Sequence, residues 1–277
     1  MPLILRLLPF LFLFIYLPAQ GSAQKRIISL SPPITEEIYL LGLGENIIAN
    51  TIYCTRPKEA ERKEKVGSVV SVNVESIVRL QPDIVFASPL TDQRALERLR
   101  KIGIEVTVFP QPKNFHELCK SFLTLGKMLG REEKAREIVA HATKGMEELK
   151  RRYGGKEGPT VLFQIGSKPL FVANKDSIIH SYLEYVGGQN VAKDAKTGLF
   201  SREEVIRLNP EYLIIVTMGV DGEQERENWS KFRELRAARE RKVYLIDAYK
   251  LCSPTPLSYV EVALKLASIF YGTKFGK

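Results

Sequence analysis

The sequence predicts an α/β protein of two lobes joined by one long helix, with a ligand cleft between the lobes. A helix–proline–strand motif occurs twice, as N-V-E-S-I-V-R-L-Q-P-D-I-V at 73–85 and as S-R-E-E-V-I-R-L-N-P-E-Y-L at 201–213. A supersecondary unit that recurs about half a chain apart indicates two similar lobes. Short apolar strands alternate with helices in both halves, which is typical of parallel sheets covered by helices on both faces. One long amphipathic segment at 131–153 separates the halves.

The two copies of the motif agree where the helix begins and where it ends. Each begins with a helix-capping residue, Asn73 or Ser201, and carries a glutamate two positions later, Glu75 or Glu203. Each helix ends before a proline, which disfavours helical conformation in the preceding residue and makes the chain turn. We therefore expect one short helix followed by one buried strand in each lobe.

The N-terminal lobe is expected to span residues 24–130 and to be Rossmann-like. Its first helix should end at Gly42 and Gly44, because glycine is a common helix-stop signal. Strands alternate with helices along this lobe. The expected elements are the strands 26–30, 47–51, 83–88 and 104–109 and the helices 35–43, 73–81 and 94–102.

The segment 131–154 is expected to be a bridging helix. Its apolar residues recur at spacings of three and four and form one stripe on a helix that is otherwise highly charged. They are Ala135, Ile138, Val139, Ala142, Met146, Leu149 and Tyr153. A helix of this length spans roughly 35 Å, about the width of a small domain. A helix with one apolar stripe between two α/β lobes indicates a rigid brace.

The C-terminal lobe, 155–277, repeats the pattern of the first and is again expected to be Rossmann-like. A second, fainter similarity supports duplication, because G-Q-N-V-A at 188–192 resembles G-E-N-I-I-A at 44–49. The expected elements are the strands 160–165, 213–217 and 242–247 and the helices 177–186, 201–209 and 257–271.

Residues 1–23 are predicted to be a signal peptide. The apolar run at 7–17 is short for a membrane-spanning helix, and the small residues G-S-A at 21–23 are typical of a secretory cleavage site. The alternative is an anchor that stays in place. The first cysteine is Cys54, so we expect no lipid-anchor cysteine near the cleavage point and a periplasmic mature chain that starts near Gln24.

The charge and the metal-binding residue types exclude several classes of function. The net charge of +9 falls to +8 without residues 1–23, which carry one arginine and no acid. Charges of both signs alternate on the expected helices, which favours solvated surfaces, and we expect no nucleic-acid partner. Neither the three cysteines nor the three histidines follow a metal-ligand spacing, so no metal site is expected. No catalytic constellation appears either, so we expect no enzyme and no cofactor.

Several motifs together resemble the ABC-transporter substrate-binding proteins for cobalamin and iron–siderophores. They are R-I-I-S-L-S-P-P-I-T-E at 26–36, Y-C-T-R-P at 53–57, N-V-E-S-I at 73–77, F-V-A-N-K-D-S-I at 171–178, G-G-Q-N-V-A at 187–192 and K-V-Y-L-I-D at 242–247. The resemblance covers nearly the whole chain after residue 23, in order. It implies a monomer with two lobes, one long joining helix and little hinge closure, which delivers its ligand to an ABC permease dimer in the membrane.

The resemblance also implies which residues dock on the permease. The family presents one surface glutamate per lobe, and the repeated motif aligns these glutamates with Glu75 and Glu203. The alternative is that an acid in the first turn of a helix is favoured simply by the helix dipole. Glu204 is rejected as a docking residue, because its spacing from Ser201 fits a capping box.

Ligands of open parallel sheets bind outside the carboxyl ends of the strands, so the candidate ligand residues lie in the loops there. The candidates are Pro32, Tyr53, Arg56, Val69, Phe171, Phe200, Asp247, Tyr249 and Lys250. Cobalamin-binding relatives carry ligand-contacting aromatics at the positions of Tyr53 and Phe171 and a tryptophan where this chain has Val69. Phe200 stands approximately for a second tryptophan, and Trp229 is interpreted as packing.

Cobalamin or a related corrinoid is the first expected ligand. The alternatives are a ferric siderophore, whose anionic oxygens would favour Arg56 and Lys250, and haem. Cys54 and Cys252 also fall in expected cleft loops, where each is either a small hydrophobe or an axial ligand to a bound metal. Two other functions stay open: a Rossmann-type enzyme, and a ligand sensor with the same fold.

Overall fold

The computed structural model describes residues 25–155, 157–216 and 221–273. The predicted signal peptide lies outside these residues. Within them, no helix combines the length and the apolar character that crossing a membrane requires.

The N-terminal lobe contains a five-stranded parallel sheet in the order β3-β2-β1-β4-β5. Alternate side chains of its strands enter two different cores, with Phe86 packed toward α1, α4 and α5 and Val85 toward α2 and α3. Its strands are β1 (Ile27–Ser29), β2 (Ile47–Asn50), β3 (Glu64–Lys65), β4 (Ile84–Ala87) and β5 (Glu105–Val108). Its helices are α1 (Pro32–Leu40), α2 (Val74–Arg79), α3 (Gln93–Lys101) and α4 (Phe115–Met128), with the short 3₁₀ turns Gly44–Asn46 and Lys58–Arg62.

The C-terminal lobe differs from the expected all-parallel sheet by one strand. Its order is β10-β9-β6-β7, with β8 also beside β6, and β7 is antiparallel to β6. The connection between β6 and β7 is a tight turn, which permits only an antiparallel pair, because a parallel pair needs a long crossover. The strands are β6 (Thr160–Ser167), β7 (Leu170–Val172), β8 (Gln189–Asn190), β9 (Tyr212–Val216) and β10 (Val243–Ile246). The helices are α6 (Ile178–Val186), α7 (Arg202–Leu208), α8 (Gly222–Ser230), α9 (Arg236–Arg239), α10 (Ala248–Cys252) and α11 (Pro256–Tyr271).

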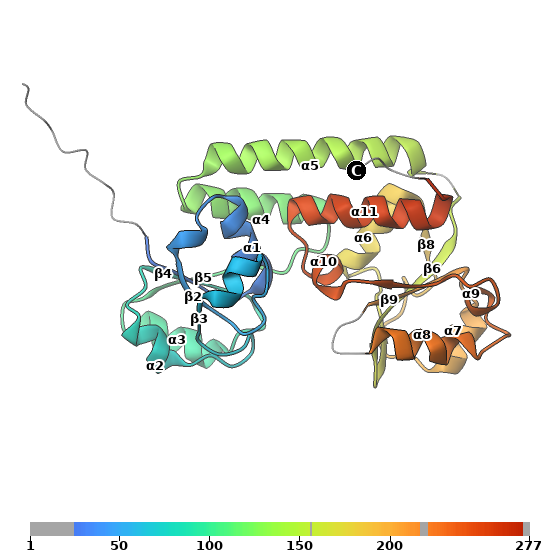
Figure 1. Ribbon diagram of the computed structural model, residues 1–277, viewed down its shortest axis with the longest axis horizontal. Helices are drawn as coiled ribbons and strands as arrows, with labels where there is room; N and C mark the ends of the chain where they lie inside the picture. Colours follow the sequence, from blue (N-terminus) through green and yellow to red (C-terminus); the bar gives the residue numbers. More distant parts are fainter. Residues whose placement is uncertain (1–24, 156, 217–220, 274–277) are drawn as a thin grey trace, which may run out of the picture.

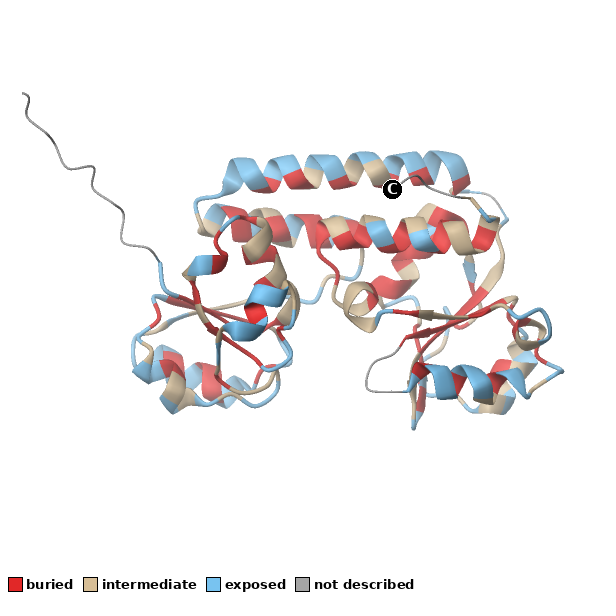
Figure 2. Cartoon of the chain, viewed as in Figure 1, coloured by how far each residue is buried: buried red, intermediate tan, exposed pale blue. Residues whose placement is uncertain are grey.

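The bridging helix α5 (Glu132–Tyr153) lies across both lobes, as the apolar stripe predicted (Figure 1). The stripe is buried against α4 and α11, while the outward face of the helix is exposed (Figure 2). The largest apolar core contains Phe115 and Leu118 of α4 together with Met146 of α5 and Tyr259 of α11. Because this core is shared between the lobes, side chain packing opposes their independent movement.

Both copies of the repeated motif form the predicted helix and strand. Asn73 accepts a hydrogen bond from the backbone N–H of Ser76, and Ser201 accepts one from that of Glu204, so both begin their helices as N-caps. Glu204 completes a capping box with Ser201, as the spacing predicted. In Figure 1, α2 and α7 lie on the same side of the molecule, far from α5.

Candidate ligand cleft and docking helices

A cleft of about 1200 Å³ lies between the lobes. Most of its walls come from segments that follow the carboxyl ends of parallel strands, where ligands of such sheets bind. In the N-terminal lobe these segments follow β1, β2, β4 and β5, and in the C-terminal lobe α10 follows β10. Helix α4 adds Leu118 and Ser121, and β7 adds Phe171.

Seven of the nine predicted ligand residues line this cleft. They are Pro32, Tyr53, Arg56, Val69, Phe171, Asp247 and Tyr249. The rings of Tyr53 and Phe171 are 57% and 42% exposed, so both faces of the cleft offer an accessible aromatic surface.

Phe200 and Lys250 do not line the cleft. Leu199 pairs with Phe171, and neighbouring residues of an extended chain point to opposite sides. Phe200 accordingly packs into the apolar core that contains Trp229, whose interpretation as a packing residue is confirmed by its full burial. Lys250 lies in helix α10, and its ammonium group pairs with Glu261 of α11.

Three contacts hold the lobes together across the cleft. The guanidinium of Arg56 forms an ion pair with Asp247 of the other lobe and lies 4.8 Å from the ring centroid of Tyr249. The hydroxyl of Tyr249 donates a hydrogen bond of 3.0 Å to the backbone carbonyl of Pro32. Four of the predicted residues therefore also join the two lobes directly.

The ionisation of these groups follows from their surroundings. Partial burial would raise the pKa of Asp247, but hydrogen bonds from the backbone N–H of Lys250 and from Arg56 outweigh it and hold this pKa below its usual range. Burial raises the pKa of Tyr249 strongly, and the nearby Cys54 and Glu36 act in the same direction. The ion pair is therefore charged at neutral pH, and the phenol keeps the proton that it donates to Pro32.

The charges that line the cleft nearly balance. Among the lining residues that the structure describes, the cations are Arg56 and Lys113 and the carboxylates, besides Glu37, are Asp176 and Asp247. Arg56 is already paired with Asp247, so Lys113 is the cation of the described cleft lining that forms no ion pair.

The three cysteines are free thiols, and only one of them lines the cleft. Cys54 is fully buried, with its sulfur 3.2 Å from the hydroxyls of Thr35 and Thr51. Cys252 lines the cleft, but burial raises the pKa of its thiol to about 12. Because the thiolate is the form that binds metals, the environment of Cys252 does not favour ligation, and Cys54 does not line the cleft.

Sequence reasoning missed part of the floor and walls of the cleft. Glu37, Ser88 and the segment 109–113 line it without having been predicted. The rule that ligands bind beyond the carboxyl ends of parallel strands could have predicted the loops after β4 and β5. Glu37 also carried a signal, because it follows Ile34 by three positions and thus places an acid on the buried side of a helix.

The predicted docking glutamates are both exposed, in the first turns of α2 and α7. A hydrogen bond from its own backbone N–H, and a second one from the Ser201 hydroxyl, lower the pKa of Glu203. Its carboxylate is therefore negatively charged at neutral pH and available to a cationic partner. Beside it, Arg202 turns inward and donates two hydrogen bonds of 2.9 Å to the buried carboxylate of Glu225.

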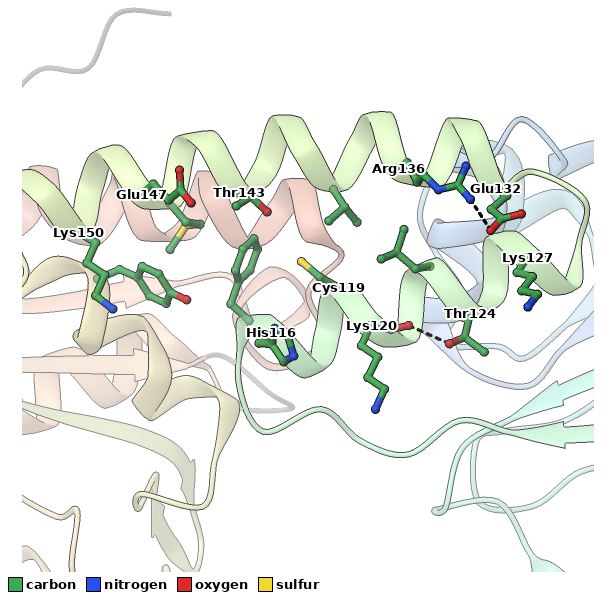
Figure 3. Close-up of a pocket in the computed structure, with 15 residues that line it drawn as sticks. His116, Cys119, Lys120, Thr124, Lys127, Glu132, Arg136, Thr143, Glu147 and Lys150 are labelled. Carbon is green, nitrogen blue, oxygen red and sulfur yellow. Dashed lines mark hydrogen bonds and ion pairs between the residues drawn. The ribbon is translucent and has the colours of Figure 1, made fainter.

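A second hollow, of about 790 Å³, runs between α4 and α5 (Figure 3). Cys119 lines it, whereas the preceding Leu118 lines the cleft, so α4 separates the two hollows. Its polar rim carries the ion pair between Arg136 and Glu132. The buried polar atoms that lack a partner among the described residues all lie elsewhere, two of them on cleft residues. The cleft is therefore the candidate site.

Comparisons with known proteins agree with this geometry. Residues 27–250 match the model of a family described as periplasmic binding protein. An uncharacterised ABC transporter substrate-binding lipoprotein, YvrC of Bacillus subtilis (strain 168), is 31% identical over 262 residues, which cover 91% of this chain and 81% of that protein. A vitamin B12-binding protein of Yersinia pestis (strain Pestoides F) is 30% identical over 202 residues, covering 72% of this chain and 71% of that protein.

Solved structures share the fold. The periplasmic haem-binding protein HutB of Vibrio cholerae superimposes with a TM-score of 0.80 at 19% identity, covering 90% of this chain and all of that one. The periplasmic vitamin B12-binding protein BtuF of Vibrio cholerae superimposes with a TM-score of 0.76 at 24% identity, covering 89% of this chain and 96% of that one. With two lobes, a bridging helix, a cleft at the strand ends and a family match over most of its length, this chain belongs to the periplasmic binding protein family.

Proposed function

We propose that this protein is the extracytoplasmic substrate-binding protein of an ABC importer, and that it captures cobalamin or a related corrinoid for the membrane permease. The cleft carries this proposal, because it holds about 1200 Å³ between the rings of Tyr53, Phe171 and Tyr249. Pockets for drug-sized ligands hold about 300–1000 Å³, so this cleft suits a large macrocycle. The relatives named vitamin B12-binding proteins support the same ligand.

In this proposal the protein acts as a monomer in the periplasm, after cleavage of residues 1–23. Its two docking helices lie on one side of the molecule, so Glu75 and Glu203 suit a permease made of two similar subunits. Each glutamate would pair with a cation of one permease subunit. Neither role requires a catalytic residue.

The balance of charge favours a corrinoid over a ferric siderophore. Recognition of anionic oxygens calls for unpaired arginine or lysine side chains. Arg56 is paired with Asp247, and Lys250, expected to pair with such a ligand, binds Glu261 outside the cleft instead. Among the described cleft residues, this leaves Lys113 as the one cation without an ion pair. Corrinoids carry uncharged carboxamides around their ring, which a nearly neutral cleft accommodates without burying an unpaired charge.

Haem is the second candidate, and one observation favours it. The phenol of Tyr53 is 57% exposed on the cleft wall, and tyrosine is among the side chains that ligate haem iron. The two candidates separate in one experiment, isothermal calorimetry of the full mature chain with cyanocobalamin and with haemin. We expect tight binding of cyanocobalamin; binding of haemin alone would replace the corrinoid by haem, and binding of neither would refute the proposed ligands.

Docking is tested by reversing both exposed charges, Glu75→Lys together with Glu203→Lys. We expect the double variant to bind cyanocobalamin within about twofold of the wild type, since both residues lie outside the cleft. We also expect it to lose the stimulation of ATP hydrolysis by the reconstituted permease. The matched control reverses Glu97 of α3 and Glu184 of α6, which are exposed glutamates outside both docking helices.

Unchanged stimulation by the docking variant would contradict these two assignments. A deletion strain distinguishes transport from sensing by the same fold. Loss of ligand uptake supports the importer, whereas intact uptake with altered gene regulation would support the sensor.

A further inference from the structure

One acidic side chain in the cleft is buried without a partner. Glu37 is 5% exposed and lines the cleft from helix α1. Its carboxyl makes no hydrogen bond and no ion pair with any residue that the structure describes. The carboxyl oxygens keep some exposure, and because Glu37 lines the cleft, a ligand there can reach them.

The surroundings of Glu37 favour the neutral acid. Burial raises the pKa of this carboxyl well above its ordinary value, and the neighbouring Glu36 raises it further. The titratable group that faces it from α4 is Cys119, whose own pKa is raised to about 12 by burial and by Glu37. With no cation in contact, these surroundings favour the protonated form of Glu37, and in that form the carboxyl can donate a hydrogen bond.

Other polar groups without partners belong to the same cleft. The Nη1 of Arg56 and the hydroxyl of Ser88 are buried and have no hydrogen-bond partner among the described residues, and both residues line the cleft. Leaving such groups unpaired lowers the stability of the unliganded protein. These two buried groups, together with the carboxyl of Glu37, which opens onto the same cleft without a protein partner, point to polar atoms of a ligand that meet them.

We propose that the carboxylic acid of Glu37 donates a hydrogen bond to an uncharged carbonyl oxygen of the ligand, and so selects ligands that carry carboxamides over ligands that carry carboxylates. A carboxamide oxygen accepts this bond without introducing charge into the buried end of the cleft. A carboxylate would be repelled by the ionised form of Glu36 and would lose its own hydration. This inference rests on the proposed function, because it assigns to Glu37 a role toward the same ligand.

The test compares Glu37→Leu and Glu37→Gln with the wild type in calorimetry with cyanocobalamin. Glutamine keeps an N–H donor at this position, so we expect its affinity to stay within about threefold of the wild type. Leucine has a similar volume and no donor, and it leaves the ligand oxygen unpaired, so we expect affinity to fall about tenfold or more. Glu97→Leu, the same substitution on an exposed helix outside the cleft, should leave affinity unchanged.

Each outcome has a definite meaning. If cyanocobalamin binds Glu37→Leu as tightly as the wild type, the role of Glu37 is refuted while the proposed function stands. If the wild type binds haemin alone or neither compound, the proposed corrinoid is refuted, and the selection of carboxamides by Glu37 with it. Urea unfolding of Glu37→Leu checks that the variant is folded, and we expect no loss of stability, because leucine removes a buried polar group without a partner.

Discussion

Each lobe buries one glutamate, and the two differ in their partners. Glu225 of α8 is 4% exposed and accepts hydrogen bonds from Arg202 and, at 2.6 Å, from Gln164. Trp229 donates a further bond of 2.6 Å to the same Gln164. Glu37 of α1 is equally buried and has no partner among the described residues.

The difference shows that burial alone does not define the role of a carboxyl group. Glu225 belongs to a paired network that fixes α7 against α8, so its role is structural. Glu37 faces the cleft without a partner, so we assign it to the ligand. The two docking helices differ in the same way. A buried ion pair between Arg202 and Glu225 fixes α7, whereas the ion pair of α2, between Arg79 and Glu64, lies on the surface.

The strongest test of this comparison introduces the same substitution at both buried glutamates. Glu225→Leu leaves the partly buried Arg202 without its anionic partner and removes one of the two acceptors of the Gln164 amide, so we expect a loss of about 3 kcal/mol in the free energy of unfolding. Glu37→Leu removes no partner and should cost nothing. Urea unfolding at neutral pH measures both, and equal losses in the two variants would contradict the distinction.

The second test measures how stability depends on pH, which follows from the raised pKa of Glu37. A raised pKa means that the folded state holds this proton more tightly than the unfolded chain, whose ordinary value is 4.5. The contribution of the group is therefore fully present below that value and is lost as pH rises through the folded pKa. Glu37→Gln cannot ionise, so we expect its stability relative to the wild type to increase as the pH rises above 4.5.

Urea unfolding across this range measures the second effect. The wild type and Glu37→Gln share Glu36 and Cys119, the titratable groups that face position 37, so their difference isolates one carboxyl. A difference that does not change with pH would mean that Glu37 is ionised in the folded protein. Glu225→Gln serves as a comparison, since it alters a carboxyl that is already paired.

The fold was predictable because its determinants are local and periodic. The repeat predicted both capped helices, and the apolar stripe of α5 predicted the residues that it buries. The rule on strand ends predicted most of the cleft. The antiparallel β7 was not predicted, because an apolar run does not reveal the direction of its neighbour.

The predictions that Phe200 and Lys250 line the cleft failed for a different reason. Lys250 lies beside Tyr249, which lines the cleft, so one residue of shift in a short helix decides which side chain reaches it. Phe200 instead packs into the core that contains Trp229. The periodicity of α1 could have placed Glu37 on the buried side of the helix, but its lack of a partner is a property of the folded surroundings. No spacing in the sequence reveals that an acid has no cation near it.

The smallest test removes the caps of the docking helices, in the variants Asn73→Ala and Ser201→Ala. Each loses the side-chain bond to an N-terminal backbone N–H, so we expect each to lose about 1 kcal/mol in the free energy of unfolding. Their effects on docking should nevertheless differ. Helix α7 keeps its buried link from Arg202 to Glu225, whereas the ion pair of α2, from Arg79 to Glu64, lies on the surface.

We therefore expect Asn73→Ala to weaken stimulation of the permease ATPase more than Ser201→Ala does, at similar cost in stability. The reason is that a carboxylate docks only where its helix holds it, and loss of the cap frays the first turn that carries it. Titrating the permease with each variant gives the concentration for half-maximal stimulation. Equal shifts would show that the buried ion pair beside Glu203 contributes nothing to docking, and the contrast between the lobes would then concern stability alone.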